Sequence, residues 1–226
     1  MAGLRGALFT VCFYGLMAVM GVLGVVLLWS EAHTRAWMKL HNRIAFVMLR
    51  GLCGIRLEIR GTVPTGRVVV AAKHQSLLDV LMLYNALPEA RFVMKRELTR
   101  APVFGFYAMR TGAVPVDRSG RGGAMRGLVE AFSAAPGQVV VYPQGTRVAP
   151  GASAPYRKGA AVIAEALDAP IVLVATNAGK VWPRRGVAKH PGTAVVSFLE
   201  TLPVPSEIEA TMAEVEARTE AASDAL

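Results

Sequence analysis

Apolar residues follow two different spacings along the chain, and these spacings predict alternating strands and helices. Short apolar runs rich in valine predict strands at residues 66–72, 91–95, 112–116, 138–142, 169–176 and 193–199. Segments in which apolar residues return every three or four positions predict helices at residues 77–86, 102–110, 122–134, 157–167 and 206–221. Strands and helices that alternate in this way are typical of an α/β fold with a mixed, largely parallel sheet flanked by helices.

The first part of the chain has a different pattern. Residues 6–30 are 25 positions without a charged side chain, bounded by Arg5 and Glu31. As a helix rising ~1.5 Å per residue, this segment would measure ~37 Å, enough to cross a hydrocarbon core of ~30 Å. A secretory signal peptide is an alternative, but its apolar region is shorter, about 7–15 residues. The pattern therefore favours a membrane helix over a signal peptide or a buried core helix.

A basic amphipathic helix is predicted directly after this segment. Its apolar residues recur at helical spacing at Trp37, Leu40, Ile44, Val47 and Met48. Basic residues lie between them at Arg35, Lys39, Arg43 and Arg50. Such a helix suits a membrane surface with anionic lipids, and packing on the domain as an ordinary surface helix is the alternative. The two segments also fit an interfacial hairpin that does not cross the bilayer. We expect residues 1–60 to anchor the protein at a membrane and residues 61–226 to form the α/β domain.

The net charge of +9 is unevenly distributed along the 226 residues. The last 21 residues hold six acidic side chains and one arginine, which leaves 24 basic and 10 acidic side chains in residues 1–205. No zinc-ligand, helix-turn-helix or RNA-binding signature accompanies this positive charge, so we expect no nucleic-acid partner. Membrane lipids, a phosphorylated substrate or an acidic carrier protein fit better with the apolar segment, which also raises the mean hydropathy to +0.40. Cys12 and Cys53 form no metal or disulfide pattern, and we expect neither a metal nor a cofactor.

Polar segments follow several of the predicted strands. They are KHQSLLD (73–79), KREL (95–98), PVDRSGR (115–121) and PQGTR (143–147). Binding and catalytic residues of open α/β sheets gather beyond the carboxyl ends of the strands. These four segments are therefore the places where we expect a functional site.

His74 and Asp79 in the first of these segments allow two interpretations. Ser76 and Asp79 form an S-x-x-D pattern close to a capping box, so the aspartate could simply cap a helix. Residues five apart on a regular helix point ~140° away from each other. If the helix begins at Ser76, however, His74 precedes it and can fold back toward Asp79. A carboxylate on one imidazole nitrogen would then fix the tautomer and leave the other nitrogen as a base.

Four segments, taken in order, resemble the sequence blocks of the glycerolipid acyltransferase family. HQSLLD (74–79) is similar to the H-x4-D block, and GAVPVDR (112–118) to the second block. YPQGTR (142–147) is similar to F-P-E-G-T-R, and APIVLVAT (169–176) to the fourth block, a proline followed by an apolar strand. The resemblance covers roughly residues 65–180. Within the family, the overall build is most similar to the bacterial members that act on lysophosphatidate.

The resemblance implies an O-acyltransferase. It would move a fatty acyl group from acyl-CoA or an acyl carrier protein to the free hydroxyl of 1-acyl-sn-glycerol 3-phosphate (lysophosphatidic acid), giving phosphatidic acid. His74 would be the general base, Asp79 its orienting partner, and the amides of residues 76–79 would face the oxyanion. The acceptor phosphate would be bound by Arg147, with Gly145, Thr146, Arg118 and Lys95 as further substrate-binding candidates. The resemblance also implies the cytoplasmic (inner) membrane, with the catalytic domain facing the cytoplasm.

Three positions depart from the family pattern. Lys73 stands where asparagine usually precedes the histidine, and Tyr142 and Gln144 replace the phenylalanine and the glutamate of F-P-E-G-T-R. Glutamine keeps the hydrogen-bonding reach of glutamate but loses its charge. Two alternatives therefore stay open: an acyltransferase for another lyso-lipid, such as a lyso-aminolipid, and a lipid-binding scaffold with weak catalysis.

Overall fold

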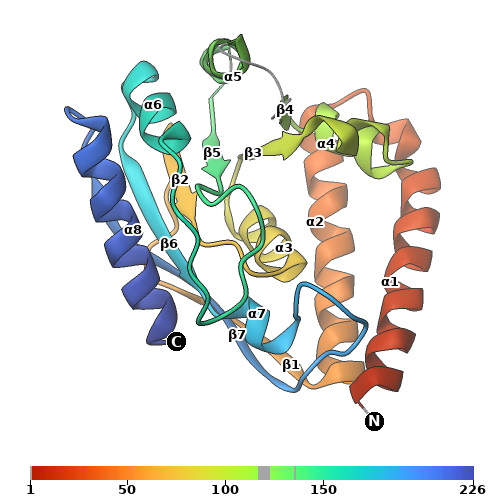
Figure 1. Ribbon diagram of the computed structural model, residues 1–226. Coiled ribbons are helices and arrows are strands. Elements are labelled where there is room, and N and C mark those ends of the chain that lie inside the picture. Colours follow the sequence, from red (N-terminus) through yellow and green to blue (C-terminus); the bar gives the residue numbers. More distant parts are fainter. Residues whose placement is uncertain (1, 117–122, 135) are drawn as a thin grey trace.

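The computed structural model describes residues 2–116, 123–134 and 136–226, and the strands in these ranges form a single sheet (Figure 1). The strands are β1 (Ile55–Arg60), β2 (Val68–Ala72), β3 (Ala90–Lys95), β4 (Val114–Val116), β5 (Gln138–Val141), β6 (Ile171–Thr176) and β7 (Gly192–Leu202). Their spatial order is β1-β7-β6-β2-β5-β3-β4. Neighbouring strands run parallel except β6 and β7, which are antiparallel. The predicted mixed, largely parallel sheet is confirmed.

Helices cover both faces of this sheet (Figure 1). The α-helices are α1 (Ala2–Leu23), α2 (Glu31–Met48), α3 (Leu77–Ala86), α4 (Phe104–Arg110), α5 (Gly123–Ser133), α6 (Gly159–Ala166), α7 (Ala178–Val181) and α8 (Ile208–Asp224). Single turns of other helical type are η1 (Gly24–Leu27), η2 (Leu49–Cys53) and η3 (Arg96–Arg100). The helices α1, α2, α3 and α7 share one hydrophobic core, and α5, α6 and α8 share the other.

The central strand β2 contributes to both cores because successive side chains of a strand point to opposite faces. Val68, Val70 and Ala72 pack in the core beneath α1, α2 and α3. Val69 and Ala71 pack in the core beneath α6 and α8. All five residues are buried, as expected for a parallel strand covered on both sides. This alternation decides where the polar residues after β2 point.

Strand β1 lies outside the set of strands predicted from the sequence. Charged residues alternate with apolar ones in IRLEIR (55–60), and most of the outward positions are exposed. This is the pattern of an edge strand, and β1 pairs in parallel with β7. The division into a membrane anchor at residues 1–60 and a domain at residues 61–226 stays a prediction, with β1 on the anchor side of that boundary.

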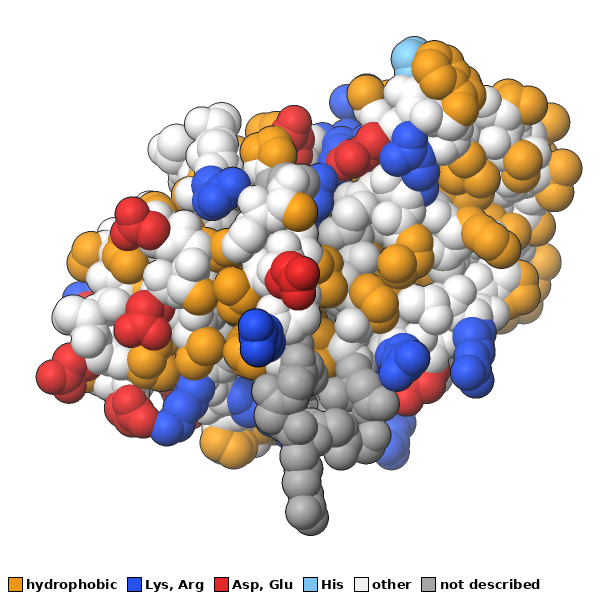
Figure 2. All heavy atoms as spheres, turned by 90° about the horizontal axis from the view of Figure 1, so that it is seen from above, with side chains coloured by type: hydrophobic (Ala, Val, Ile, Leu, Met, Phe, Trp, Pro, Cys, Tyr) orange, Lys and Arg blue, Asp and Glu red, His pale blue; other side chains and the backbone are white. Residues whose placement is uncertain are grey.

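Helix α1 and turn η1 form an apolar helix of 26 residues, which is long and apolar enough to cross a membrane. Phe9 and Phe13 on one side of it are buried in the domain core, where the ring of Phe9 meets the edge of Trp182. The other side is open, with Val11 and Val22 both 71% exposed. Figure 2 shows hydrophobic side chains gathered over the side of the molecule where α1 lies, and acidic ones toward α8. The helix thus joins the domain through one stripe and presents a wider apolar surface outward.

Helix α2 packs on the domain more closely than a purely membrane-facing helix would. Arg35 is buried and donates to the carbonyl of Ala90 over 2.9 Å, and Lys39 donates to that of Leu87 over 2.6 Å. Of the four basic residues expected at the lipid surface, only Arg43 and Arg50 are exposed. The expectation was therefore wrong for Arg35 and Lys39, because backbone carbonyls of the neighbouring chain segments accept hydrogen bonds from them.

Candidate active site

The site lies at the carboxyl end of β2, where the chain enters a short polar segment before α3. Alternation along the strand continues past Ala72 and sends Lys73 and His74 to opposite sides of the sheet. His74 turns toward α3, and Lys73 turns toward α8. The two helical layers therefore each hold one of these neighbouring residues.

His74 and Asp79 are in direct contact. The Nδ1 atom of His74 lies 2.9 Å from Oδ1 of Asp79, and the carboxylate is buried while 16% of the imidazole side chain is exposed. An ionised carboxylate only accepts hydrogen bonds, so Nδ1 is the donor and Nε2 carries the free lone pair. No hydrogen-bond partner of Nε2 is found among the residues that the structure describes. The predicted fold-back of His74 onto the first turn of the helix is present in the structure.

Asp79 also caps α3 with its second oxygen. Its Oδ2 accepts from the backbone amides of Gln75 (2.8 Å) and Ser76 (2.7 Å). The hydroxyl of Ser76 accepts from the amide of Leu78 over 3.1 Å. The carboxylate therefore makes both predicted contacts at once, one oxygen to the imidazole of His74 and the other to the helix cap. The amides of Ser76 and Leu78 are used inside the turn, so of the amides at residues 76–79 these two are not available to an oxyanion.

The YPQGTR segment lies beside His74 because β5 is the parallel neighbour of β2. The ring of Tyr142 stacks on the imidazole with centroids 4.0 Å apart and planes 21° apart. On the other side of the segment, the amide of Val148 donates to the carbonyl of His74 over 2.8 Å. Contacts at both ends of the segment therefore fix it against the histidine.

The hydroxyl of Tyr142 is buried and has no hydrogen-bond partner among the described residues. Burial raises the pKa of Tyr142 well above its usual range, and the negative charge of Asp79 adds to the shift. The phenol is therefore neutral at physiological pH. Its role beside His74 is to supply a flat, uncharged ring that restricts the imidazole on one face.

The three residues proposed for phosphate binding follow Tyr142 in a tight turn. Gly145 has a positive φ of 67°, a conformation that favours glycine, and its amide donates to the carbonyl of Tyr142 over 2.8 Å. Thr146 is exposed and Arg147 is half-buried. The guanidinium of Arg184 donates to the carbonyl of Arg147 over 2.8 Å, which brings a second arginine to this turn. Arg184 is not among the site residues predicted from the sequence, where the adjacent pair Arg184 and Arg185 was the local signal of a cationic cluster.

Of the remaining two candidates, Lys95 and Arg118, the structure describes only Lys95. Lys95 ends β3, is exposed, and lies at the same edge of the sheet as His74, since β3 and β2 both run parallel to β5. Arg118 lies outside the described residues. The site that can be described therefore combines His74, Asp79 and the turn around Arg147, with Lys95 two strands away.

A cluster that sequence reasoning missed lies behind the histidine. Lys73, Gln144 and Tyr156 all contact the carboxylate of Glu220 in α8. No local pattern could reveal these contacts, because Glu220 follows Lys73 by 147 positions. Among the described residues, no three histidine, cysteine or acidic side chains are arranged to bind a metal ion.

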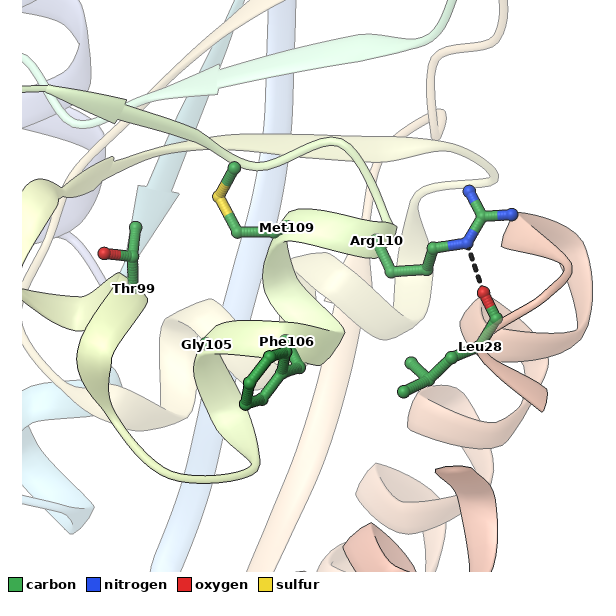
Figure 3. Close-up of a pocket in the computed structure, with 6 residues that line it drawn as sticks. All are labelled: Leu28, Thr99, Gly105, Phe106, Met109 and Arg110. Carbon is green, nitrogen blue, oxygen red and sulfur yellow. Dashed lines mark hydrogen bonds between the residues drawn. The ribbon is translucent and has the colours of Figure 1, made fainter. Parts of the chain in front are cut away.

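A separate hollow of about 490 Å³ lies between α4 and the end of the N-terminal apolar helix (Figure 3). It is lined by Leu28, Thr99, Gly105, Phe106, Met109 and Arg110. The guanidinium of Arg110 crosses to the carbonyl of Leu28 and fastens α4 to the helical pair. None of the lining residues belongs to the group around His74, so we do not assign the chemistry to this hollow.

Fold and site together define an α/β acyltransferase with a histidine–aspartate pair, and comparison with known proteins agrees. The chain belongs to the Acyltransferase family, whose sequence model matches residues 54–177. It is 31% identical over 184 residues to the 1-acyl-sn-glycerol-3-phosphate acyltransferase of Pseudomonas aeruginosa, across 79% of this chain and 72% of that protein. It is 34% identical over 137 residues to the 1-acyl-sn-glycerol-3-phosphate acyltransferase alpha of Mus musculus, but spans only 48% of that protein.

A solved structure shares the complete fold. The crystal structure of the 1-acyl-sn-glycerophosphate (LPA) acyltransferase from Thermotoga maritima superposes with a TM-score of 0.84, over 100% of this chain and 97% of that one. The two sequences are 21% identical, so this similarity concerns the fold.

Proposed function

We propose that this protein transfers a fatty acyl group from an acyl thioester to the free hydroxyl of 1-acyl-sn-glycerol 3-phosphate, giving phosphatidic acid. The observation that carries the proposal is the contact of 2.9 Å between His74 and the buried Asp79, next to the turn that contains Arg147 and is contacted by Arg184. Membership of the Acyltransferase family and the names of the relatives support the reaction and the acceptor.

In this mechanism His74 is the general base. Its Nε2 takes the proton of the acceptor hydroxyl as the oxygen bonds to the thioester carbonyl carbon. Asp79 keeps Nδ1 protonated and stabilises the imidazolium that forms. When the tetrahedral intermediate collapses, the carbon–sulfur bond breaks and the imidazolium returns its proton to the leaving sulfur. General-base assistance of this kind is worth about 10²–10⁴ in rate.

The acceptor phosphate binds at the turn that contains Gly145, Thr146 and Arg147. A guanidinium can bind phosphate through two parallel hydrogen bonds, and the nearby Arg184 adds a second positive charge. Lys95 and Arg118 are further phosphate-binding candidates, from the same edge of the sheet and from the second sequence block. Together these residues would place the acceptor hydroxyl near His74.

The acyl donor is acyl-CoA or an acyl carrier protein. Both are anionic, and the positive charge of the chain favours either one. The apolar face of α1 supports binding at a membrane, where the acceptor and the product reside. We propose that this is the cytoplasmic (inner) membrane, with the catalytic domain facing the cytoplasm. Membrane lipids would thus both bind the apolar face of α1 and supply the acceptor.

The replacement of glutamate by Gln144 gives no reason to prefer a different acceptor. Gln144 is buried and its amide points to the carbonyl of Ala154 and to Glu220, 3.4 Å from each. The substitution therefore does not change the surface that an acceptor meets. His74 and Asp79 keep the geometry that catalysis needs, which argues against a purely lipid-binding scaffold.

Turnover of a defined acceptor tests the proposal. Purified protein incubated with lysophosphatidate and an acyl thioester should form phosphatidic acid, and His74→Ala should lower kcat by roughly 10²–10⁴ because the base is lost. An acceptor panel that includes a lyso-aminolipid, compared by kcat/KM, checks the substrate. His190→Ala, at an exposed histidine outside the proposed site, is the matched control and should retain parental kcat. Equal turnover by the parent and the His74 variant would disprove the mechanism.

A further inference from the structure

The ammonium group of Lys73 is a buried charge immediately before the proposed catalytic base. Only 2% of its side chain is exposed. A buried ammonium is costly unless an opposite charge and hydrogen bonds compensate it. The compensating group is the carboxylate of Glu220, whose Oε2 lies 2.5 Å from Nζ of Lys73. The residue next to His74 is therefore held by α8, at the other end of the chain.

The second oxygen of Glu220 reaches the neighbouring strand connection. Its Oε1 accepts from the hydroxyl of Tyr156 over 2.7 Å and from the amide of Gln144 over 3.4 Å. Lys73 and Gln144 belong to the two segments that flank the imidazole, one after β2 and one after β5. A single carboxylate thus ties both segments together on the face of the sheet opposite to Asp79.

Helix α8 is itself firmly docked, so that it can serve as a fixed support. Ser223 accepts from the amide of Thr176 at the end of β6 over 3.3 Å, and Asn177 donates to the carbonyl of Leu226 over 3.3 Å. The amide of Lys73 donates to the carbonyl of Val174 in the same strand, over 2.9 Å. The backbone before His74 and the helix that carries Glu220 are therefore both hydrogen-bonded to the same strand, β6.

We propose that Glu220 is a positioning residue for the acyl transfer, and that it acts by holding Lys73 and thereby the backbone of His74. This proposal rests on the function proposed above. It also accounts for two of the three departures from the family pattern. A lysine precedes the histidine and Gln144 replaces the glutamate of the turn, and α8 supplies the carboxylate that both side chains contact. The proposed effect of Glu220 on catalysis then depends on the presence of Lys73.

The test is a double-mutant cycle between Lys73 and Glu220, with kcat and KM for lysophosphatidate as readouts. Glu220→Gln keeps the shape of the side chain but removes the charge, so the unpaired ammonium should move and displace His74. Small misplacements of catalytic groups cost up to about 10²-fold in rate, and we expect kcat to fall roughly tenfold to hundredfold with KM within about threefold. In the Lys73→Asn background the same change should alter kcat less than about twofold, because the group through which it acts is absent.

Glu209→Gln is the matched control, since Glu209 lies on the same helix and forms an exposed ion pair with Lys158. It should leave kcat and KM unchanged. A parental kcat in Glu220→Gln would overturn the proposal, and so would an equal loss in both backgrounds, which would mean that Glu220 acts independently of Lys73.

A readout that needs no turnover separates this proposal from the proposed function. The ring signals of the four histidines can be followed by NMR in detergent. Glu220→Gln should shift the His74 signal, assigned with His74→Ala, and leave that of the exposed His33 in place. A shifted signal in a protein that does not acylate lysophosphatidate would refute the function but retain the positioning role. An unshifted His74 signal would refute the positioning role.

Discussion

At the scale of single residues, Asp79 combines two tasks that are usually assigned to different side chains. One oxygen orients His74, and the other accepts two backbone amides at the start of α3. The local sequence could show that both tasks were available, but not that both are performed. That depended on the backbone path before Ser76, which is set by the parallel neighbours of β2 rather than by the residues themselves.

Two substitutions distinguish loss of the hydroxyl cap of α3 from loss of the carboxylate that contacts His74. Ser76→Ala removes only the hydroxyl cap of α3 and should cost about 1 kcal/mol in unfolding free energy with kcat retained within a few-fold. Asp79→Asn presents an amide where two acceptor oxygens are needed, so it should lower kcat by roughly 10²–10⁴. Thermal unfolding and initial rates with lysophosphatidate provide the two measurements. Parental kcat in Asp79→Asn would show that His74 needs no orienting carboxylate.

At the scale of elements, the strands and helices of the sheet region followed from the hydrophobic pattern, whereas contacts between distant elements did not. The valine-rich runs at β2, β5 and β6 predicted buried parallel strands because both faces of such strands are apolar. Strand β1 was not predicted, because its alternating charged and apolar residues follow directly after a segment with helical spacing. The pairing of Lys73 with α8 could not be predicted, because spacing along the chain carries no information across 147 positions.

The packing of α1 against α2 should depend on pH through His41. Burial lowers the pKa of His41 below its usual value, outweighing the opposite effect of Asn42, and its ring meets that of Phe13 edge-on. The folded protein therefore binds this proton less readily than the unfolded chain. The stabilising contribution is present above the unfolded pKa of about 6.5 and is lost as the pH falls below it.

We therefore expect the melting temperature to fall between pH 7 and pH 5 more steeply in the parent than in His41→Gln. Scanning calorimetry or near-UV circular dichroism in detergent at several pH values checks this. A parallel fall in both proteins would show that other groups dominate. His33→Gln serves as the control, because His33 is exposed at the start of α2.

At the scale of the whole molecule, the two layers around the sheet have different surfaces. The layer that contains α1 presents exposed apolar side chains, whereas α8 on the opposite side is rich in acidic residues (Figures 1 and 2). Acidic side chains are repelled by an anionic lipid surface, and the apolar ones are attracted to its interior. The molecule should therefore bind a bilayer in one orientation, with α8 directed away from it.

Charge introduced on α1 should weaken this binding. Val11→Asp and Val22→Asp place a carboxylate on the open side of the helix, and an aspartate near the centre of a membrane helix costs about 2.5–3.5 kcal/mol. The fraction of protein that co-sediments with vesicles of anionic phospholipid should fall markedly for either variant. Ala213→Asp on the exposed side of α8 should bind as the parent does. Equal co-sedimentation of all four proteins would exclude α1 as the binding surface.

The alternation of side chains along β2 has a consequence for how this sequence tolerates change in length. Removing one residue from the strand would exchange the destinations of the lysine and the histidine, so that the imidazole would enter the acidic layer and the ammonium would meet Asp79. All four side chains would still be present, yet His74 would no longer contact Asp79 and Lys73 would no longer contact Glu220. The number of residues in β2, and not only their type, is thus needed to direct the lysine and the histidine to their partners.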